Sequence, residues 1–179
     1  MPRILAVFAI MVLGLVQPAF AHGPVRQKAV EKVEIAKTPD EVWAIVKNYD
    51  SIAKWHPAIA SSPADKGNEI GSVRILTLKS GGKITEQLER YDDAAHSYFY
   101  RITDVDVKVL PVSNYSATLE VKAGADGKGS VVEWRGAFYR GYPNNDPPPE
   151  LNDDAALKAV TEVYRAGLDH LKELAEKGQ

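Results

Sequence analysis

One carboxylate breaks the pattern of an otherwise regular strand, and it is the residue best placed to do chemistry. The run Lys83–Tyr91 (KITEQLERY) alternates, so Glu86 should share one face with two apolar side chains and point toward a core. A carboxylate there needs a partner or a polar cavity, because burying an isolated charge is costly. Arg74, on the adjacent hairpin strand, is the best candidate partner, with Tyr100 of the next strand nearby. Two interpretations stay open: an internal ion pair that fixes the sheet, or a polar patch inside a ligand cavity.

A second conspicuous spot is Trp55-His56-Pro57, at the end of a short predicted helix. The helix should end there because a proline disfavours α geometry in the residue before it. His56 is then either a structural cap or a ligand contact and proton carrier at the mouth of a cavity. As a general acid or base, Glu86 would need a second positioned group, such as His56 or Tyr100, within a few ångström.

The composition excludes several kinds of chemistry. The chain has 179 residues, a formal net charge of -2 and no Cys, which rules out disulfides, thiolate metal sites and Cys catalysis. Charges are mixed and form no basic stripe, so nucleic-acid binding is not expected. None of the four His shows metal-ligand spacing, and no phosphate loop or nucleotide motif occurs. We therefore expect neither a metal nor a cofactor.

The first 21 residues have the features of a cleaved export signal. Arg3 precedes the apolar run Ile4–Val16, and Ala19-Phe20-Ala21 matches an A-x-A cleavage site. The mature protein is then expected to begin at His22, to reside in a periplasm and to keep no membrane anchor; an uncleaved anchor is the alternative. An N-terminal His can chelate copper through its amine and imidazole, although this leader is also typical of a disordered segment.

The elements that must position these groups are strands followed by one long helix. Apolar residues recur at steps of three and four over Asn152–Lys177, which predicts a helix with one apolar stripe. Short turns such as Ser80-Gly81-Gly82 join the strands, so the sheet should be antiparallel. Six or seven such strands twist and curl, and the long helix is the only element able to fill the concave face. We predict one α+β domain over residues 22–179.

The expected bounds follow from alternation, caps and turn residues. Helices should cover Pro39–Tyr49, with Thr38 as the N-cap, and Asp50–Trp55, whereas Pro143–Leu151 is too rich in proline for regular structure. Glu31 falls on the apolar side of the first strand, so that strand's first residues could lie outside the sheet. The strands are expected at Ala29–Lys37, Ile59–Pro63, Gly71–Lys79, Lys83–Tyr91, His96–Asp104, Ser113–Ala123 and Ser130–Tyr142.

Aromatic side chains should line the space between the sheet and the long helix. Tyr115, Trp134 and Phe138 fall on the inward faces of their strands, and Tyr164 lies on the apolar stripe of the helix. The small residues Gly167 and Ala156 on the same helix would leave room for a ligand.

Several short motifs occur in a fixed order along the chain: Thr38–Trp43 (TPDEVW), Trp55–Pro57 (WHP), Gly71–Arg74 (GSVR), Gly82–Glu86 (GKITE), Asp92, Tyr100-Arg101, Leu110-Pro111 and Val132–Trp134 (VEW). Taken in this order, they resemble the START/birch-allergen superfamily, and most closely its bacterial polyketide cyclase/dehydrase branch. The resemblance runs from about Lys28 to the C-terminus. It implies the helix-grip fold, a curved antiparallel sheet of six to seven strands wrapped around a long C-terminal helix, with two short helices after the first strand. It also implies that Leu110-Pro111 is a gate loop over a cavity mouth.

The export signal and the segment Tyr142–Asp154 narrow the resemblance to the periplasmic MxaD family of methylotrophic bacteria. This implies a non-enzymatic accessory protein that promotes the interaction or electron transfer between methanol dehydrogenase and its cytochrome c. The loops Pro143–Glu150 and Val105–Pro111 would be its contact surfaces.

Two alternatives remain beside this interpretation, since one fold hosts many functions. The first is a carrier of a small hydrophobic ligand or lipid in the cavity between sheet and helix. The second is a cyclase or hydrolase that uses Glu86, Arg74 and His56.

Overall fold

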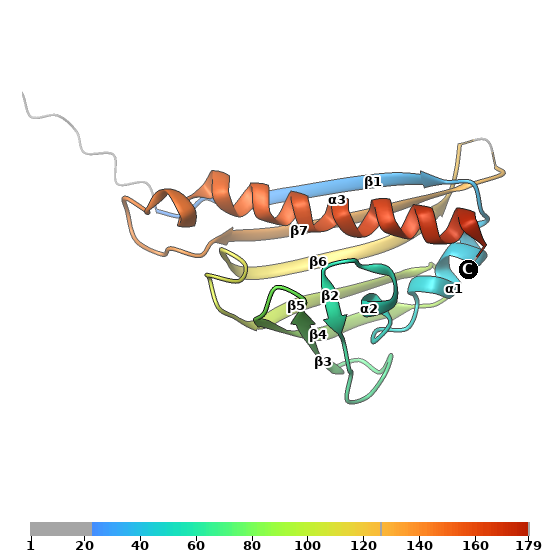
Figure 1. Cartoon of the computed structure of the whole chain (residues 1–179), viewed down its shortest axis with the longest axis horizontal. Helices are drawn as coiled ribbons and strands as arrows, with labels where there is room; N and C mark the ends of the chain where they lie inside the picture. The colour runs from blue at the N-terminus through green and yellow to red at the C-terminus, as the bar shows by residue number, and fades with distance from the viewer. Residues whose placement is uncertain (1–22, 126, 179) are drawn as a thin grey trace, which may run out of the picture.

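The computed structural model describes residues 23–125 and 127–178, so the predicted signal peptide and His22 lie outside the described residues. Seven antiparallel strands form one sheet in the order β1-β7-β6-β5-β4-β3-β2. The long helix α3 and the short helices α1 and α2 lie on the same side of this sheet (Figure 1). The predicted α+β helix-grip fold is therefore confirmed. The strands are β1 Gln27–Ile35, β2 Ile59–Ser61, β3 Val73–Leu78, β4 Lys83–Asp92, β5 Ser97–Val105, β6 Val112–Ala123 and β7 Ser130–Arg140; the helices are α1 Pro39–Val46, α2 Ile52–Trp55, the 3-10 turn η1 Pro149–Leu151 and α3 Asp153–Lys177.

The first helix begins where the sequence predicts and ends earlier. Thr38 and Glu41 form a reciprocal capping box, in which Thr38 N donates to Glu41 Oε2 at 2.8 Å. The helix stops at Val46 instead of Tyr49, because Tyr49 leaves the helical path to bury its ring completely. Its backbone N–H then donates to Asn68 Oδ1 at 2.7 Å, which replaces the lost helical bond.

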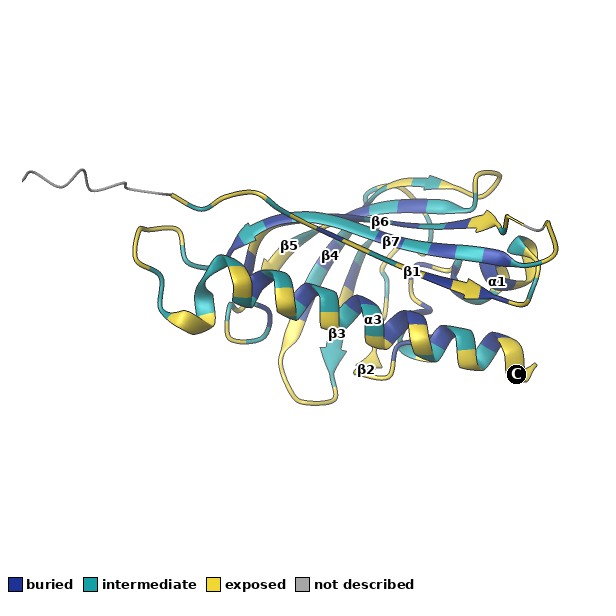
Figure 2. Ribbon diagram, turned by 90° about the horizontal axis from the view of Figure 1, so that it is seen from above, coloured by how far each residue is buried: buried dark blue, intermediate teal, exposed yellow. Residues whose placement is uncertain are grey.

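The helix α3 packs its apolar stripe on the concave face and also seals the free edge of β1 (Figure 2). Arg165 Nη2 donates to Lys32 O at 3.1 Å, and Lys172 Nζ donates to Glu34 O at 2.6 Å. Unpaired backbone groups at a sheet edge otherwise invite pairing with another chain, so these contacts protect the edge.

The first strand extends further toward the N-terminus than the sequence analysis expects. It begins at Gln27 and includes Glu31, which the alternation places on the inward side. The carboxylate is accommodated because Arg165 of α3 reaches it at 3.2 Å. A cation from the covering helix thus allows an acidic residue in a position that otherwise requires an apolar one.

Smaller differences also have local causes. His96 adopts a positive φ of 48°, which ends a turn and delays the start of β5 to Ser97. The proline-rich segment is not wholly irregular, since Pro149–Leu151 forms one 3-10 turn. None of the helices within the described residues is both long and apolar enough to cross a bilayer.

Candidate functional site

A partly open cavity of about 230 Å³ lies between the sheet and the segment that runs from α2 into β2. Its walls are mostly aliphatic, and its polar groups come from a few inward-facing side chains. Of the residues singled out from the sequence, six line it: His56, Glu86, Tyr100, Leu110, Tyr115 and Trp134. The other lining residues are Ile52, Ala58, Ile59, Leu76, Leu78, Ser80, Ile84, Ile102, Val109 and Val163.

The Arg74–Glu86 ion pair is present and buried. The two residues lie directly opposite each other on β3 and β4, and Arg74 Nε donates to Glu86 Oε2 at 2.6 Å. Arg74 Nη1 also donates to the backbone oxygen of Tyr49 at 2.7 Å. The guanidinium carbon lies 4.1 Å from the centre of the Tyr49 ring and 4.9 Å from that of Tyr100, so two aromatic rings flank the cation.

The two ends of this pair face different surroundings. Arg74 does not line the cavity, whereas Glu86 does. Among the described residues, Glu86 Oε1 has no hydrogen-bond donor, because Arg74 binds only Oε2. Burial raises the pKa of Glu86, and the charge of Arg74 opposes that shift. Glu86 is therefore a cavity-lining carboxylate, one oxygen of which has no hydrogen-bond donor among the described residues.

A chain of hydroxyl groups begins beside this carboxylate and runs to α3. Trp134 Nε1 donates to Tyr100 Oη at 3.0 Å, Tyr100 Oη lies 3.5 Å from Tyr115 Oη, and Tyr115 Oη is bonded to Tyr164 Oη. Burial raises the pKa of all three tyrosines well above the ordinary value of 10.0. They consequently stay neutral and act as hydrogen-bond donors and acceptors only.

His56 has both ring nitrogens engaged. Nε2 lies 3.0 Å from Val163 O, which can only accept, and Nδ1 lies 3.2 Å from the backbone N–H of Ala58, which can only donate. These partners assign the neutral tautomer with its proton on Nε2. Burial lowers the pKa of His56, which also favours the neutral ring. The imidazole holds α2 against α3 and has no lone pair left to accept a proton from a substrate.

The small residues of α3 do not leave the space that the sequence analysis expects. A Cβ added at Gly167 would lie 2.6 Å from His56 Cδ2 and 3.0 Å from Trp134 Cζ3, so these two rings already occupy the room. Ala156 is completely buried. The expectation of a gap at Gly167 and Ala156 is therefore wrong, and the cavity lies farther toward β3, β4 and β5, below the segment Val109–Leu110.

The remaining candidates are buried but do not line the cavity. Phe138 stacks on Tyr115 with ring centres 5.9 Å apart, and Tyr164 stacks on Trp134 at 4.4 Å. Trp55 meets the edge of Trp134 at 5.6 Å. These rings, together with Arg74, support the side chains that face the cavity and fix their orientation.

Of the two residues of the predicted gate loop, Leu110-Pro111, one lines the cavity. Leu110 lines the cavity and Pro111 does not, while Val109 next to them does. A Cβ added at Gly82 would lie 2.5 Å from Val109 Cγ2, so the β3–β4 turn and the gate loop meet beside the cavity. Sequence reasoning missed Val109 because a lone aliphatic residue in a loop carries no signal of chemistry. The alternation of β4 places Ile84 on the inward face with Glu86, and the alternation of β3 could have identified Leu76 in the same way.

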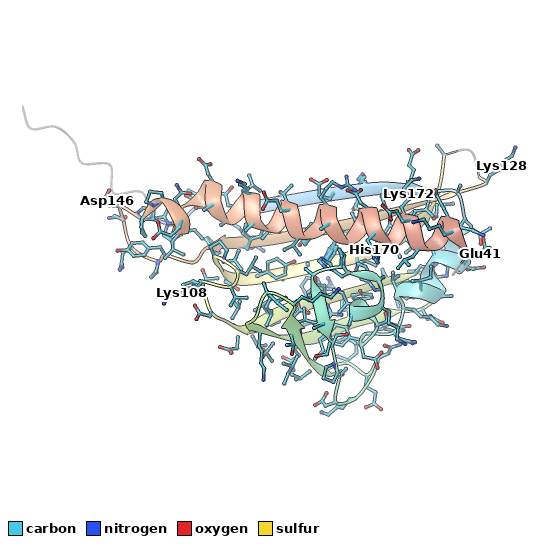
Figure 3. All side chains as sticks on the ribbon, viewed as in Figure 1. Glu41, Lys108, Lys128, Asp146, His170 and Lys172 are labelled. Carbon is cyan, nitrogen blue, oxygen red and sulfur yellow. The ribbon has the colours of Figure 1, made fainter. Side chains whose placement is uncertain are left out.

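The described residues contain no group of three or more His, Asp and Glu side chains that could hold a metal ion. Two of the histidines, His56 and His170, serve the packing of helices instead. His56 contacts Val163 O, and His170, labelled on α3 in Figure 3, places Nδ1 2.8 Å from Trp55 O.

Comparison with known proteins gives the same fold. Residues 26–176 match the family described as "Polyketide cyclase / dehydrase and lipid transport". The protein XoxI from Bacillus cereus is 30% identical, with a TM-score of 0.70 over 84% of this chain and 96% of that one. Norcoclaurine synthase from Thalictrum flavum, solved with dopamine and hydroxybenzaldehyde, is similar in fold at 14% identity, with a TM-score of 0.66 over 99% of each chain.

An abscisic acid receptor of Arabidopsis thaliana is 34% identical over 83 residues, which are 45% of this chain and 38% of the receptor. The proteins similar to this chain in sequence or in fold thus include both a receptor and an enzyme, so the fold alone does not assign an activity. The match over residues 26–176 covers most of the sequence, and the chain belongs to the polyketide cyclase/dehydrase and lipid transport family.

Proposed function

We propose that this protein binds a small, neutral and largely apolar molecule in its cavity and does so without catalysis. The observation that carries the proposal is a mostly apolar cavity lined by Glu86, whose Oε1 has no hydrogen-bond donor among the described residues. A polar group in an apolar pocket orients its ligand and selects for hydrogen-bonding character. A ligand with a hydroxyl group would donate to Glu86 Oε1 while its hydrocarbon part fills the aliphatic walls.

The size and charge of the cavity limit the ligand. At about 30 Å³ per water, a space of about 230 Å³ equals about eight water molecules, which is smaller than a typical drug-sized pocket. No Lys or Arg occurs among the described residues that line it, so a carboxylate ligand would be buried without a counter-ion. Arg74 already neutralises Glu86, which removes the main attraction for an ammonium group.

The lack of a second free acid or base beside Glu86, among the described residues that line the cavity, supports a binding role over a cyclase or hydrolase. Both nitrogens of His56 are engaged, and Arg74 is committed to Glu86 and to the backbone of Tyr49. Glu86 alone lacks the second positioned group that acid–base catalysis requires.

Three matched probes test the ligand class: 2-phenylethanol, 2-phenylethylammonium and 3-phenylpropionate. Titration followed by amide chemical shifts should show the alcohol binding most tightly, with shifts at Ile84, Tyr100 and Leu110. The variant E86Q should lose the preference for the alcohol. Tightest binding of the carboxylate, or shifts only outside the cavity, would refute the assignment.

A second role, in protein recognition, is favoured by the hydrogen bonds that hold the proline-rich loop Pro143–Glu150 in place. Arg140, which is buried, donates to Tyr142 O at 3.0 Å, to Asn144 O at 2.9 Å and to Asp153 Oδ2 at 2.9 Å. The proline-rich loop is thereby held rigid before any partner arrives, which lowers the entropic cost of binding. Gly141 N donates to Pro111 O at 2.8 Å, so this loop and the gate loop share one end of the molecule, where Figure 3 labels Lys108 and Asp146.

Together with the resemblance to the MxaD family and the predicted export signal, this end supports a periplasmic helper of methanol dehydrogenase and its cytochrome c. Adding the protein to a mixture of the two should then change the rate of cytochrome reduction, and R140M should weaken that effect. No change in rate and no co-purification with either protein would exclude this partner role, and the probe titration above would be unaffected.

A further inference from the structure

The convex face of the sheet, on the side away from α3, carries two adjacent rows of side chains that cross the strands. Because Ala29, Trp134, Ala117 and Tyr100 are buried on the concave side, their chain neighbours point outward. The strand register places Lys28 beside Ala137, Ala137 beside Ser116, and Ser116 beside Arg101. The next row runs Val30, Arg135, Thr118, Phe99 and Arg90.

Small side chains in these rows make a recess. A hollow of about 300 Å³ lies among Lys28, Val30, Phe99, Ser116, Arg135 and Ala137. A second hollow of about 260 Å³ continues from it toward Arg90, and the two share Phe99, Thr118 and Arg135. Together they form one trough across the five neighbouring strands β1, β7, β6, β5 and β4, with Val30, Phe99 and Ala137 among its lining residues.

Several cations border the trough, although the chain as a whole carries a net charge of -2, and Asp92 is the one carboxylate among the described residues that line its hollows. Arg26 and Lys28 are exposed at the β1 end and have no ion-pair or hydrogen-bond partner among the described residues. At the opposite end, Arg90 lies 4.4 Å from the centre of the Phe99 ring and Arg101 lies 2.9 Å from Glu89. The central Arg135 is satisfied by Glu120 and Glu133.

We propose that this trough binds an extended acidic segment of a partner protein. Three strand spacings of about 4.8 Å separate Lys28 from Arg101, which is about 14 Å. An extended peptide rises about 3.4 Å per residue, and every second side chain points to the same side. Two acidic side chains four residues apart would therefore reach Lys28 and Arg101. The side chain midway between them would rest between Ala137 and Ser116.

The neighbouring carboxylates favour a peptide over a uniformly anionic surface. Glu89, Glu120 and Glu133 flank the trough beside the cations that they pair with. A lipid headgroup layer would place negative charge against all of them at once, whereas a peptide can place single acids at the cations and neutral residues elsewhere.

The probe for this site is a fluorescent Gly/Ser peptide of about nine residues with two Glu four positions apart and a Phe midway between them. Its control peptide has the same composition with the two Glu adjacent. Anisotropy at low and at about 0.15 M salt should show binding of the first peptide, weakened by salt, and at least about tenfold weaker binding of the control.

Two pairs of variants distinguish binding in the trough from nonspecific electrostatic attraction to the protein surface. The double variant R26E/K28E should bind the peptide at least about tenfold more weakly, while K158E on the exposed side of α3 should change binding less than about twofold. T118W fills the floor without altering charge and should also abolish binding, whereas T85W, on the same face outside the trough, should not. S116W serves as the second plug if T118W does not fold.

Equal losses from K158E and R26E/K28E, equal binding of the control peptide, or full binding by both plugged variants would each overturn the proposal. Tighter binding to phosphatidylglycerol vesicles than to the peptide, lost in R26E/K28E, would also overturn it by assigning the face to a membrane. The trough lies on the opposite side of the sheet from the cavity, so these results do not depend on the cavity's ligand.

Discussion

Removing either partner of the Arg74–Glu86 pair should destabilise the fold, but with opposite dependence on pH. Both side chains are almost completely buried, at 1% and 5% exposure. The variant E86Q keeps the shape of the site and leaves Arg74 charged without its carboxylate. Loss of one partner of a buried pair typically costs about 3–5 kcal/mol, and a guanidinium cannot escape this cost by losing its proton.

The variant R74M should behave differently, because a carboxyl group can become neutral. Without Arg74, burial alone acts on Glu86 and raises its pKa further above the ordinary value of 4.5. Each pKa unit is worth about 1.4 kcal/mol, so the folded protein loses stability as pH rises above the pKa of the unfolded chain. R74M should therefore regain stability when pH falls from 7 toward 5, and E86Q should not.

Urea unfolding of wild type, E86Q, R74M and R74M/E86L at both pH values tests this reasoning. The double variant replaces the pair by apolar groups and should be near wild type or up to about 4 kcal/mol more stable. The account of the pair would be refuted if both single variants lost less than about 1 kcal/mol of unfolding free energy. It would also be refuted if the double variant were no more stable than the less stable of the two single variants.

Three further predictions concern the packing around the cavity. G167A should destabilise by up to about 2 kcal/mol in urea unfolding, because overpacking against His56 outweighs a gain of about 1 kcal/mol in helix propensity; a stabilised variant would contradict the contact. Since burial lowers the pKa of His56, wild-type stability should decline as pH falls below about 6.5, and H56Q should remove that slope; an unchanged urea midpoint profile would be inconsistent with it. I84F should fill the cavity and abolish binding of 2-phenylethanol while the trough peptide still binds, and retained alcohol binding would place the ligand elsewhere.

The alternation of apolar and polar residues, together with the turn residues, was sufficient to predict the sheet. It also predicted Arg74 as the partner of the inward-facing carboxylate Glu86. Because side chains on a strand repeat every two residues, Arg74 and Glu86 could be placed on facing positions of one hairpin, and they pair at 2.6 Å. The long helix followed from its apolar period in the same way.

The errors arose where contacts between distant segments decide the local structure. Gly167 is small because the ring of His56, far away in sequence, occupies the place of its side chain. Glu31 is tolerated in β1 because Arg165 reaches it from α3. Neither fact is encoded in the local pattern, so the position of the cavity could not be derived from the helix alone.

Knowing that a side chain points toward the core was also not enough to identify the residues that line the cavity. Phe138 and Tyr164 point inward, yet Tyr115 and Trp134 separate them from the cavity. A strand pattern gives the face on which a side chain lies, but not the layer of the core in which it ends.

The most direct test of the binding role is native mass spectrometry of the protein isolated from its own host, with I84F as the control. We predict that the wild-type protein carries a small neutral compound that is absent from I84F and is released on unfolding. A wild-type protein that repeatedly carries no compound, and binds none of the three phenyl probes, would contradict the central claim that the cavity beside Glu86 is a ligand site.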